Sequence, residues 1–421
     1  MSRERSVSRL RPLFSPICVH LCSSVVFFSC APTEGDSDPD VRREDAGAED
    51  ADLPTGALVP VTAPIEVQVT PDRVLGPVLM TTLTGTAAVI WGERDVEGGA
   101  WGEPGFAVLD GTGALGTAAV HLPETGHEPV GLEPHTGLRQ LAYFTMQRGA
   151  GCAVTLHRRM LDTAGRITAG IAAVDTLDDP IAMHTASLSG NAVVLAVEGS
   201  ACTARTFPVA RVIIVGPDGA ATGSVPLGDV LRVSALAARP DGSGYMALRY
   251  TDDDGVIVDM LGPGGGRERG WTIVRRDGVC ECPSARGVLA NSGGDYLAAW
   301  AGEVDGLQSW FLHLGPYDDD LEFGADPLVT PLDARFDHQV AIAPFQGDYV
   351  VAYVPAAGGA LRIDLLRADG TLEEGWSPEV PGEVTHVAVA PVGARVAVAW
   401  IEKWAGASAP SILKAGLFAP P

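Results

Sequence analysis

Lysine is nearly absent from this chain of 421 residues. Lys403 and Lys414 are the only two, so arginine supplies 27 of the 29 basic residues. The 53 acidic residues leave a formal net charge of −24. Because phosphate backbones and anionic headgroups bind clustered Lys and Arg, this charge argues against nucleic acid or a membrane surface as a direct partner.

Helical and catalytic signatures are also missing. The body of the chain shows no amphipathic helical period of convincing length, no Gly-x-Ser-x-Gly elbow, no His-Glu-x-x-His pair and no phosphate-cradling loop. What it has instead is 51 glycines and 31 prolines, a composition that suits many short strands joined by tight turns. We therefore expect an all-β protein with no cofactor and no metal ion.

A short apolar run recurs through the chain, as in "TAAVIWGE" (86–93) and "RVAVAWIEK" (395–403). The spacing of the residues that close each run is 47 to 54, with a mean of 51.5. A second segment ending in turn residues such as Asp-Gly follows each run, and a small apolar segment precedes it, so each period holds four strands. The closing residues are Trp91, Thr145, Ala196, Tyr250, Trp300, Tyr353 and Trp400.

Four antiparallel strands in a unit of about 50 residues are typical of one β-propeller blade. Over residues 60 to 419 the chain therefore resembles seven-bladed β-propeller proteins, although the WD40 and kelch signatures are absent. The aromatic residues that close the runs are expected to pack between neighbouring blades. Two stacked smaller β domains are the alternative architecture, and the even period disfavours it.

The last period holds only three strands, near 384–390, 395–402 and 411–418. An incomplete sheet would leave an exposed edge. The segment "APIEVQVT" (63–70) lies before the first blade and has no other partner, so it is predicted to supply the outer strand of blade seven. The propeller domain then spans 59–421.

Residues 1–29 have a basic start followed by an interrupted apolar segment, which indicates an export signal. Its end, "VVFFSC", resembles the lipobox of bacterial lipoprotein signal peptides, with Cys30 as the lipidated residue, although Phe27 stands where Leu or Val is usual. An ordinary secretory signal is the alternative. Residues 30–58 are acidic and poor in large apolar side chains, which predicts a disordered tether. Ala31 resembles the outer-membrane sorting pattern, so we expect a lipid-anchored protein of the bacterial cell envelope, held at the membrane by its anchor alone.

Four further cysteines are expected to pair in an oxidising compartment. Cys152 and Cys202 fall in equivalent loops of adjacent blades and could bridge them. Cys280 and Cys282 would form a small ring if the backbone bends enough, or could ligate a metal ion.

Basic side chains recur where the first strand of a blade begins: His184, Arg232, Arg286, His338 and His386. In a propeller these five would ring one mouth of the central channel, where converging donors could bind an anionic ligand. Solvated side chains at strand starts are the alternative. The acidic stretches "YTDDDGVIVD" (250–259) and "GPYDDDLEFG" (315–324) could bind calcium, but they lack the EF-hand spacing and suit solvated turns.

The sequence thus favours a monomeric, non-catalytic binding or scaffold module for a protein or a glycan. The alternative is a propeller hydrolase or lyase acting on a sugar or a small anion at the channel mouth, an expectation that rests on analogy between folds.

Overall fold

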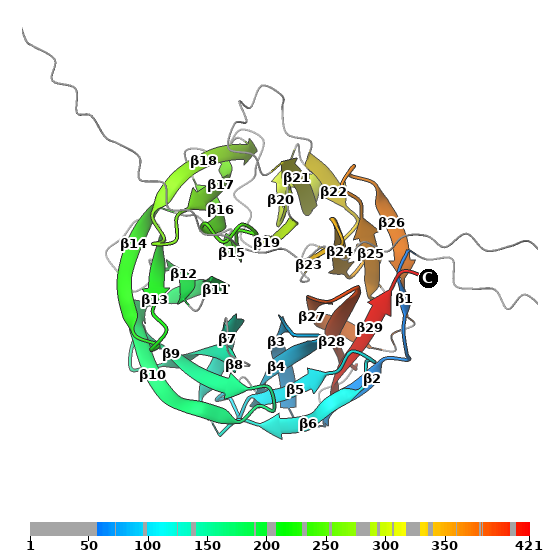
Figure 1. Ribbon diagram of the computed structural model, residues 1–421, viewed down its shortest axis with the longest axis horizontal. Helices are drawn as coiled ribbons and strands as arrows, with labels where there is room; N and C mark the ends of the chain where they lie inside the picture. The colour runs from blue at the N-terminus through cyan, green and yellow to red at the C-terminus, as the bar shows by residue number, and fades with distance from the viewer. Residues whose placement is uncertain are drawn as a thin grey trace, which may run out of the picture. The chain divides into compact units, whose positions relative to one another are not determined.

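The computed structural model describes residues 57–421 except 72, 96–98, 124, 136–139, 189–190, 200–207, 230–233, 252–254, 275–286, 293–294, 305–306, 317–328, 336–339, 359, 379, 381 and 405–409. All the regular secondary structure of these residues is β-strand, in seven antiparallel sheets arranged as a ring (Figure 1). The predicted seven-bladed β-propeller is therefore confirmed. In the described part of the chain no helix is long and apolar enough to cross a membrane.

Blades one to three each run outward in chain order from an inner strand at the channel. Blade one consists of β3 (Arg73–Leu83), β4 (Thr86–Asp95), β5 (Gly105–Leu109) and β6 (Leu115–His121). Blade two consists of β7 (His127–His135), β8 (Gln140–Arg148), β9 (Ala153–Asp162) and β10 (Ile167–Asp178). Blade three consists of β11 (Pro180–Leu188), β12 (Asn191–Glu198), β13 (Val209–Val215) and β14 (Ala221–Asp229).

Blades four to six repeat the same order. Blade four consists of β15 (Ser234–Ala238), β16 (Tyr245–Thr251), β17 (Gly255–Leu261) and β18 (Arg267–Val274). Blade five consists of β19 (Gly287–Ser292), β20 (Asp295–Val304), β21 (Leu307–Pro316) and β22 (Val329–Leu332). Blade six consists of β23 (Ala341–Phe345), β24 (Asp348–Tyr353), β25 (Arg362–Leu366) and β26 (Leu372–Trp376).

Blade seven joins the two ends of the propeller. Its strands β27 (Glu383–Val392), β28 (Arg395–Lys403) and β29 (Ser411–Ala419) come from the C-terminal end. The outer position is filled by β2 (Ile65–Thr70), which pairs antiparallel with β29, as predicted for segment 63–70. A second short strand, β1 (Val59–Pro60), pairs with the last residues of β29 and was not predicted. The edge of the sheet is thus covered by two N-terminal strands.

The core consists of hydrophobic clusters between neighbouring blades. Trp400 packs with Phe345 and Val350 of blade six, and Trp91 packs with Ala399 and Leu413 of blade seven. Trp300 and Tyr353 likewise contact the blade before their own. The predicted role of the repeated aromatic residues in packing between blades is therefore confirmed.

Tyr250 requires a correction to the repeat register. It packs against blade five, the blade after its own, whereas the other aromatic anchors face the blade before. Its neighbour Arg249 faces blade three and donates from Nη1 to the carbonyl of Leu227 at 3.0 Å. Because successive side chains on a strand point to opposite faces, a shift of one residue exchanges the two interfaces. Arg249 is the equivalent position, and the intervals on either side of it become 53 and 51 residues.

The N-terminal boundary of the propeller lies slightly before the expected residue 59. Leu58 is completely buried against blades six and seven, and the amide of Ala57 donates to the carbonyl of Glu374 at 3.0 Å. The predicted signal peptide, Cys30 and the rest of the predicted tether lie outside the described residues. Their assignment stays a prediction.

Candidate functional site

The seven inner strands, β3, β7, β11, β15, β19, β23 and β27, surround the centre of the ring, each in contact with the next (Figure 1). A cavity of about 610 Å³ lies along this wall and is lined by residues from the inner strands of blades one to five, with Met146 and Arg148 from β8. Propellers and barrels commonly hold their ligands in such a central opening. This cavity is the candidate functional site.

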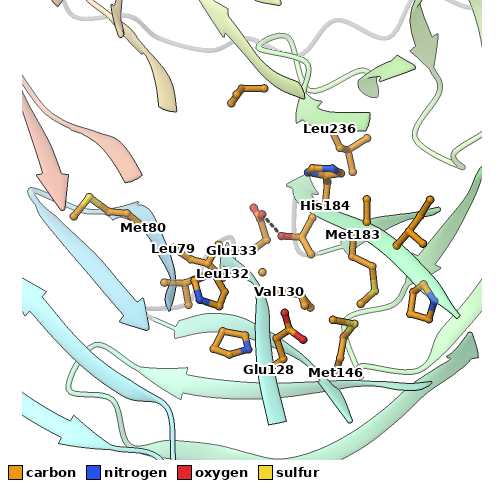
Figure 2. Close-up of a pocket in the computed structure, with 18 of the residues that line it drawn as sticks. Leu79, Met80, Glu128, Val130, Leu132, Glu133, Met146, Met183, His184 and Leu236 are labelled. Atoms are coloured by element: carbon orange, nitrogen blue, oxygen red, sulfur yellow. Dashed lines mark hydrogen bonds between the residues drawn. The ribbon is translucent and has the colours of Figure 1, made fainter. Parts of the chain in front are cut away.

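The lining is mainly apolar, and three methionines contribute to it. Met80, Met146 and Met183 come from three different strands, and Leu79, Leu132, Val130 and Leu236 add aliphatic surface (Figure 2). Among the described lining residues none is Phe, Tyr or Trp. Methionine side chains are flexible and polarizable, so such a wall can adapt to apolar groups of different shape.

Glu133 on β7 is the polar centre of the cavity. The hydroxyl of Thr185 on β11 donates to Oε1 of Glu133 at 2.6 Å, the dashed line in Figure 2. Burial raises the pKa of Glu133 to about 7, and hydrogen bonds from Thr185 and Ser187 only partly offset this effect. The carboxyl group is therefore near half-ionised at neutral pH, in the range where a ligand can change its protonation.

The position of Thr185 depends on a glycine in the neighbouring blade. A Cβ atom at Gly131 would lie 2.3 Å from the Thr185 side chain. Because Gly131 has no side chain, β7 and β11 approach closely enough for Thr185 to reach Glu133 two residues along the strand. Ser187 extends the same contact, donating to the carbonyl of Pro134 at 3.0 Å.

His184 also lines the cavity, from β11 with Leu236 beyond it (Figure 2). Burial lowers its pKa to about 4, so the imidazole is neutral at pH 7 and adds no positive charge to the channel. Burial is the cause of that shift.

Glu128 and Arg148 are further charged side chains of the wall. Burial raises the pKa of Glu128, whereas the charges of Arg148 and Arg94 and a hydrogen bond from Trp101 act in the opposite direction. Glu128 lies five residues before Glu133 on β7, which is about 16 Å along an extended strand. The charge of Arg148 thus lowers the pKa of Glu128, whereas burial dominates the pKa of Glu133.

The predicted basic ring is only partly within the described residues. Arg232, Arg286 and His338 lie outside them. His386 pairs with Ile401, one position after the anchor Trp400, whereas His184 pairs with Leu195, one position before the anchor Ala196. The two histidines thus lie at different levels of their inner strands. A ring of five basic residues stays a prediction.

His386 packs against blade one. A Cβ at Gly76 would lie 2.6 Å from its ring, so the imidazole fills the space that this glycine leaves. Thr385 provides a hydrogen-bond partner for Nδ1 at 3.1 Å. The surroundings of His386 are those of a side chain packed between blades.

The remaining candidate residues are the cysteines and the acidic stretches. Cys152 lies in the turn between β8 and β9, while Cys202, Cys280 and Cys282 lie outside the described residues, so the predicted pairings stay predictions. Asp259, from the first acidic stretch, is completely buried and forms ion pairs with Arg249 and with Arg267. The described residues contain no group of three or more His, Cys, Asp and Glu that could hold a metal ion.

Sequence reasoning missed Glu133, Thr185 and Gly131. The segment "PVGLEPHTG" (129–137) contains a glutamate between a leucine and a proline, and nothing in its spacing marks it as a channel residue. The repeat, however, places Glu133 in the first strand of blade two. An acidic residue at that position is a signal that could have identified Glu133 as a channel residue.

No family model and no curated protein matches this sequence. Solved structures do match. The BP39L lectin from Burkholderia pseudomallei has a TM-score of 0.56 at 15% identity, over 80% of this chain and 97% of that one. The polysaccharide lyase Uly1 has a TM-score of 0.52 at 9% identity, over 81% of this chain and 89% of that one. At these identities the likeness is one of fold.

Proposed function

We propose that this protein is a non-catalytic binding module that takes a segment of a partner protein into its central channel. The observation that carries the proposal is the composition of the cavity wall, an adaptable apolar surface with three methionines around a single hydroxyl-bound carboxylate. Such a wall buries apolar side chains well and offers one fixed polar contact for orientation.

A protein segment suits this wall better than a glycan does. Each sugar hydroxyl that enters an apolar cavity loses water and costs free energy unless it finds a hydrogen-bond partner. The described lining has no Phe, Tyr or Trp, and its polar side chains are Glu128, Glu133, Arg148, His184 and Thr185. A peptide side chain with a long apolar stem requires only one polar contact at its end.

The proposal also covers where the protein is located in the cell. We infer that residues 1–29 export the chain, that Cys30 carries the lipid and that the acidic tether holds the propeller away from an outer membrane. Replacing Cys30 with Ser tests this in a diderm host. The wild-type chain should fractionate with membranes and incorporate labelled fatty acid, whereas the variant should do neither. Retention of the variant in the membrane fraction would overturn the lipid anchor.

Binding in the channel is tested by photo-crosslinking from a single position. Ile181 is exposed and lines the cavity, while Ile171 is exposed on β10, the outer strand of blade two, and serves as the matched control. A benzoylphenylalanine at position 181 should give a discrete protein adduct in cells that position 171 does not give. Equal adducts from both positions, or none from 181, would contradict the proposal.

The alternative, a hydrolase or lyase acting on a sugar or a small anion, is supported by one observation. A carboxyl group whose pKa is about 7 is suited to exchange protons in catalysis. Turnover of any polysaccharide in a substrate panel that is lost in Glu133→Gln, with folding intact, would replace the binding proposal by this one.

A further inference from the structure

Buried carboxylates in this propeller are paired with cations. Each of the five aspartates and glutamates that are buried in the described residues forms an ion pair within its own blade. The pairs are Glu93–Arg73 at 3.1 Å, Glu198–Arg211 at 3.3 Å, Asp259–Arg267 at 2.7 Å, Asp364–Arg362 at 3.3 Å and Glu402–Lys414 at 3.0 Å. An unpaired charge in a protein interior is costly, which explains the rule.

Glu133 differs from these five carboxylates. It is half-buried in the channel wall, its hydrogen-bond partner is the neutral hydroxyl of Thr185, and within the described residues no Lys, Arg or His forms an ion pair with it. Arg148, the guanidinium of the same cavity, acts on Glu128 instead. The Glu133 carboxylate is thus positioned by a hydroxyl group, and a cation that balances its charge would have to come from a ligand in the channel.

We propose that Glu133 is the receptor for an organic cation, an alkylammonium or guanidinium group carried by the ligand, and that this cation displaces the carboxyl proton on binding. The inference rests on the proposed function, because it assigns the chemistry of the group that enters the channel. The cation comes either from a lysine or arginine side chain of a partner protein or from a free small amine.

The apolar wall favours an organic cation over a metal ion. Hard cations require several oxygen ligands, and the described lining supplies one carboxylate with one hydroxyl at this point. An alkyl chain behind the charged group would instead cover methionine and leucine side chains of the wall, as lysine and arginine stems do on apolar surfaces. The net charge of −24 also attracts cationic partners toward the protein.

Proton displacement gives the binding a defined pH dependence. A cation and a proton compete for the same carboxylate, so the affinity falls about tenfold per pH unit below the pKa of Glu133, which is about 7, and levels off above it. His184 and Tyr245, near Glu133, do not titrate between pH 5.5 and 8. Burial lowers the pKa of His184 to about 4, and burial and the charge of Glu133 raise that of Tyr245 to about 12.

The test is calorimetric titration of the purified full chain with hexylammonium and with its neutral counterpart, hexanol. The matched variants are Glu133→Gln, which removes the charge and keeps the shape, and Glu66→Gln, which removes an exposed carboxylate on β2, outside the cavity. We expect Glu133→Gln to weaken hexylammonium binding at least tenfold at pH 8 without changing hexanol binding. Glu66→Gln should change either affinity less than threefold.

The pH series supplies the second readout. Hexylammonium binding to the wild-type chain should weaken about fivefold from pH 7 to pH 6, because the ionised fraction of a carboxyl group with a pKa of about 7 falls by that factor, and it should release a proton, detected by repeating the titration in buffers of different ionisation enthalpy. Binding to Glu133→Gln should be independent of pH. Equal affinity of wild-type and Glu133→Gln chains for hexylammonium, or a pH series that both share, would overturn the inference.

Two outcomes separate this inference from the proposed function. If hexanol binds and position 181 crosslinks while the charge of Glu133 has no effect, the cation receptor fails and the binding channel stands. If neither probe binds and no adduct forms, the proposed function itself fails. A blocked pentapeptide with one central lysine, compared with its acetyl-lysine form and with hexylammonium, identifies the source: tighter peptide binding indicates a protein side chain, and tighter hexylammonium binding a free amine.

Discussion

Two titratable groups of the channel, Glu133 and His184, should affect the stability of the propeller in opposite directions. The pKa of Glu133 is raised from 4.5 to about 7, so the folded state holds its proton more tightly than the unfolded state does. Its contribution is greatest below pH 4.5 and is lost as the pH rises to 7. At about 1.4 kcal/mol per pH unit, the loss reaches up to ~3 kcal/mol.

The contribution of His184 has the opposite sign. Burial lowers its pKa from 6.5 to about 4, so the unfolded state binds the proton more tightly. Stability is then lost as the pH falls from 6.5 to 4, by up to ~3 kcal/mol on the same scale. Between pH 4.5 and 6.5 the two effects nearly cancel in the wild-type chain, and each is revealed by removing the other.

Urea unfolding at pH 4.5, 5.5, 6.5 and 8 measures these effects. Glu133→Gln should equal the wild type at pH 4.5 and exceed it by up to ~3 kcal/mol at pH 8, because the amide has no proton to lose. His184→Gln should lose stability steadily from pH 4.5 to 7. A difference between Glu133→Gln and wild type that is the same at pH 4.5 and pH 8 would refute the reasoning.

Three further predictions concern the propeller itself. Trp91→Ala should lower the free energy of unfolding by ~3–5 kcal/mol in urea titrations because the side chain is completely buried between blades one and seven, whereas Trp404→Ala, at an exposed position, should change it by less than ~0.5 kcal/mol. Val67→Asp should lower the free energy of unfolding by at least ~3 kcal/mol, because it places a charge on the buried face of the closing strand β2, where the side chain is 7% exposed. Val69→Asp on the same strand, where the side chain is 48% exposed, should leave the stability nearly unchanged, and thermal melts of both variants measure the difference. If Cys152 and Cys202 form the predicted disulfide, alkylation without reductant should leave both unmodified, and a reductant should lower the stability of the wild type by ~4 kcal/mol but not that of a Cys152→Ser, Cys202→Ser double variant.

The repeat allowed the architecture to be predicted. An interval of about 50 residues with four strands per period specified seven blades, and the unpaired segment before the first blade specified how the ring closes. The register within one blade was less certain, since Tyr250 and Arg249 are both large side chains next to each other. Only the tertiary structure shows which face of β16 each occupies: Tyr250 contacts blade five, and Arg249 contacts blade three.

The channel was harder to predict than the blades. Histidines and arginines recur at similar places in the period, yet His184 and His386 occupy different levels of their strands, because one pairs before and the other after the anchor residue of the neighbouring strand. Glu133 carries no signal of its own. Its raised pKa comes from burial in the channel wall, and the hydrogen bonds that partly offset this come from Thr185 and Ser187 on the next blade, about 50 residues further along the chain.

The sequence by itself determined the number of blades, the position of the closing strand and the aromatic residues between blades, because these follow from local strand patterns repeated along the chain. Tertiary structure decided which side chains share the channel and how their pKa values change. Burial and contact between blades depend on residues that are distant in sequence, and Gly131 shows this most directly, since its missing side chain matters only because Thr185 of the next blade lies against it.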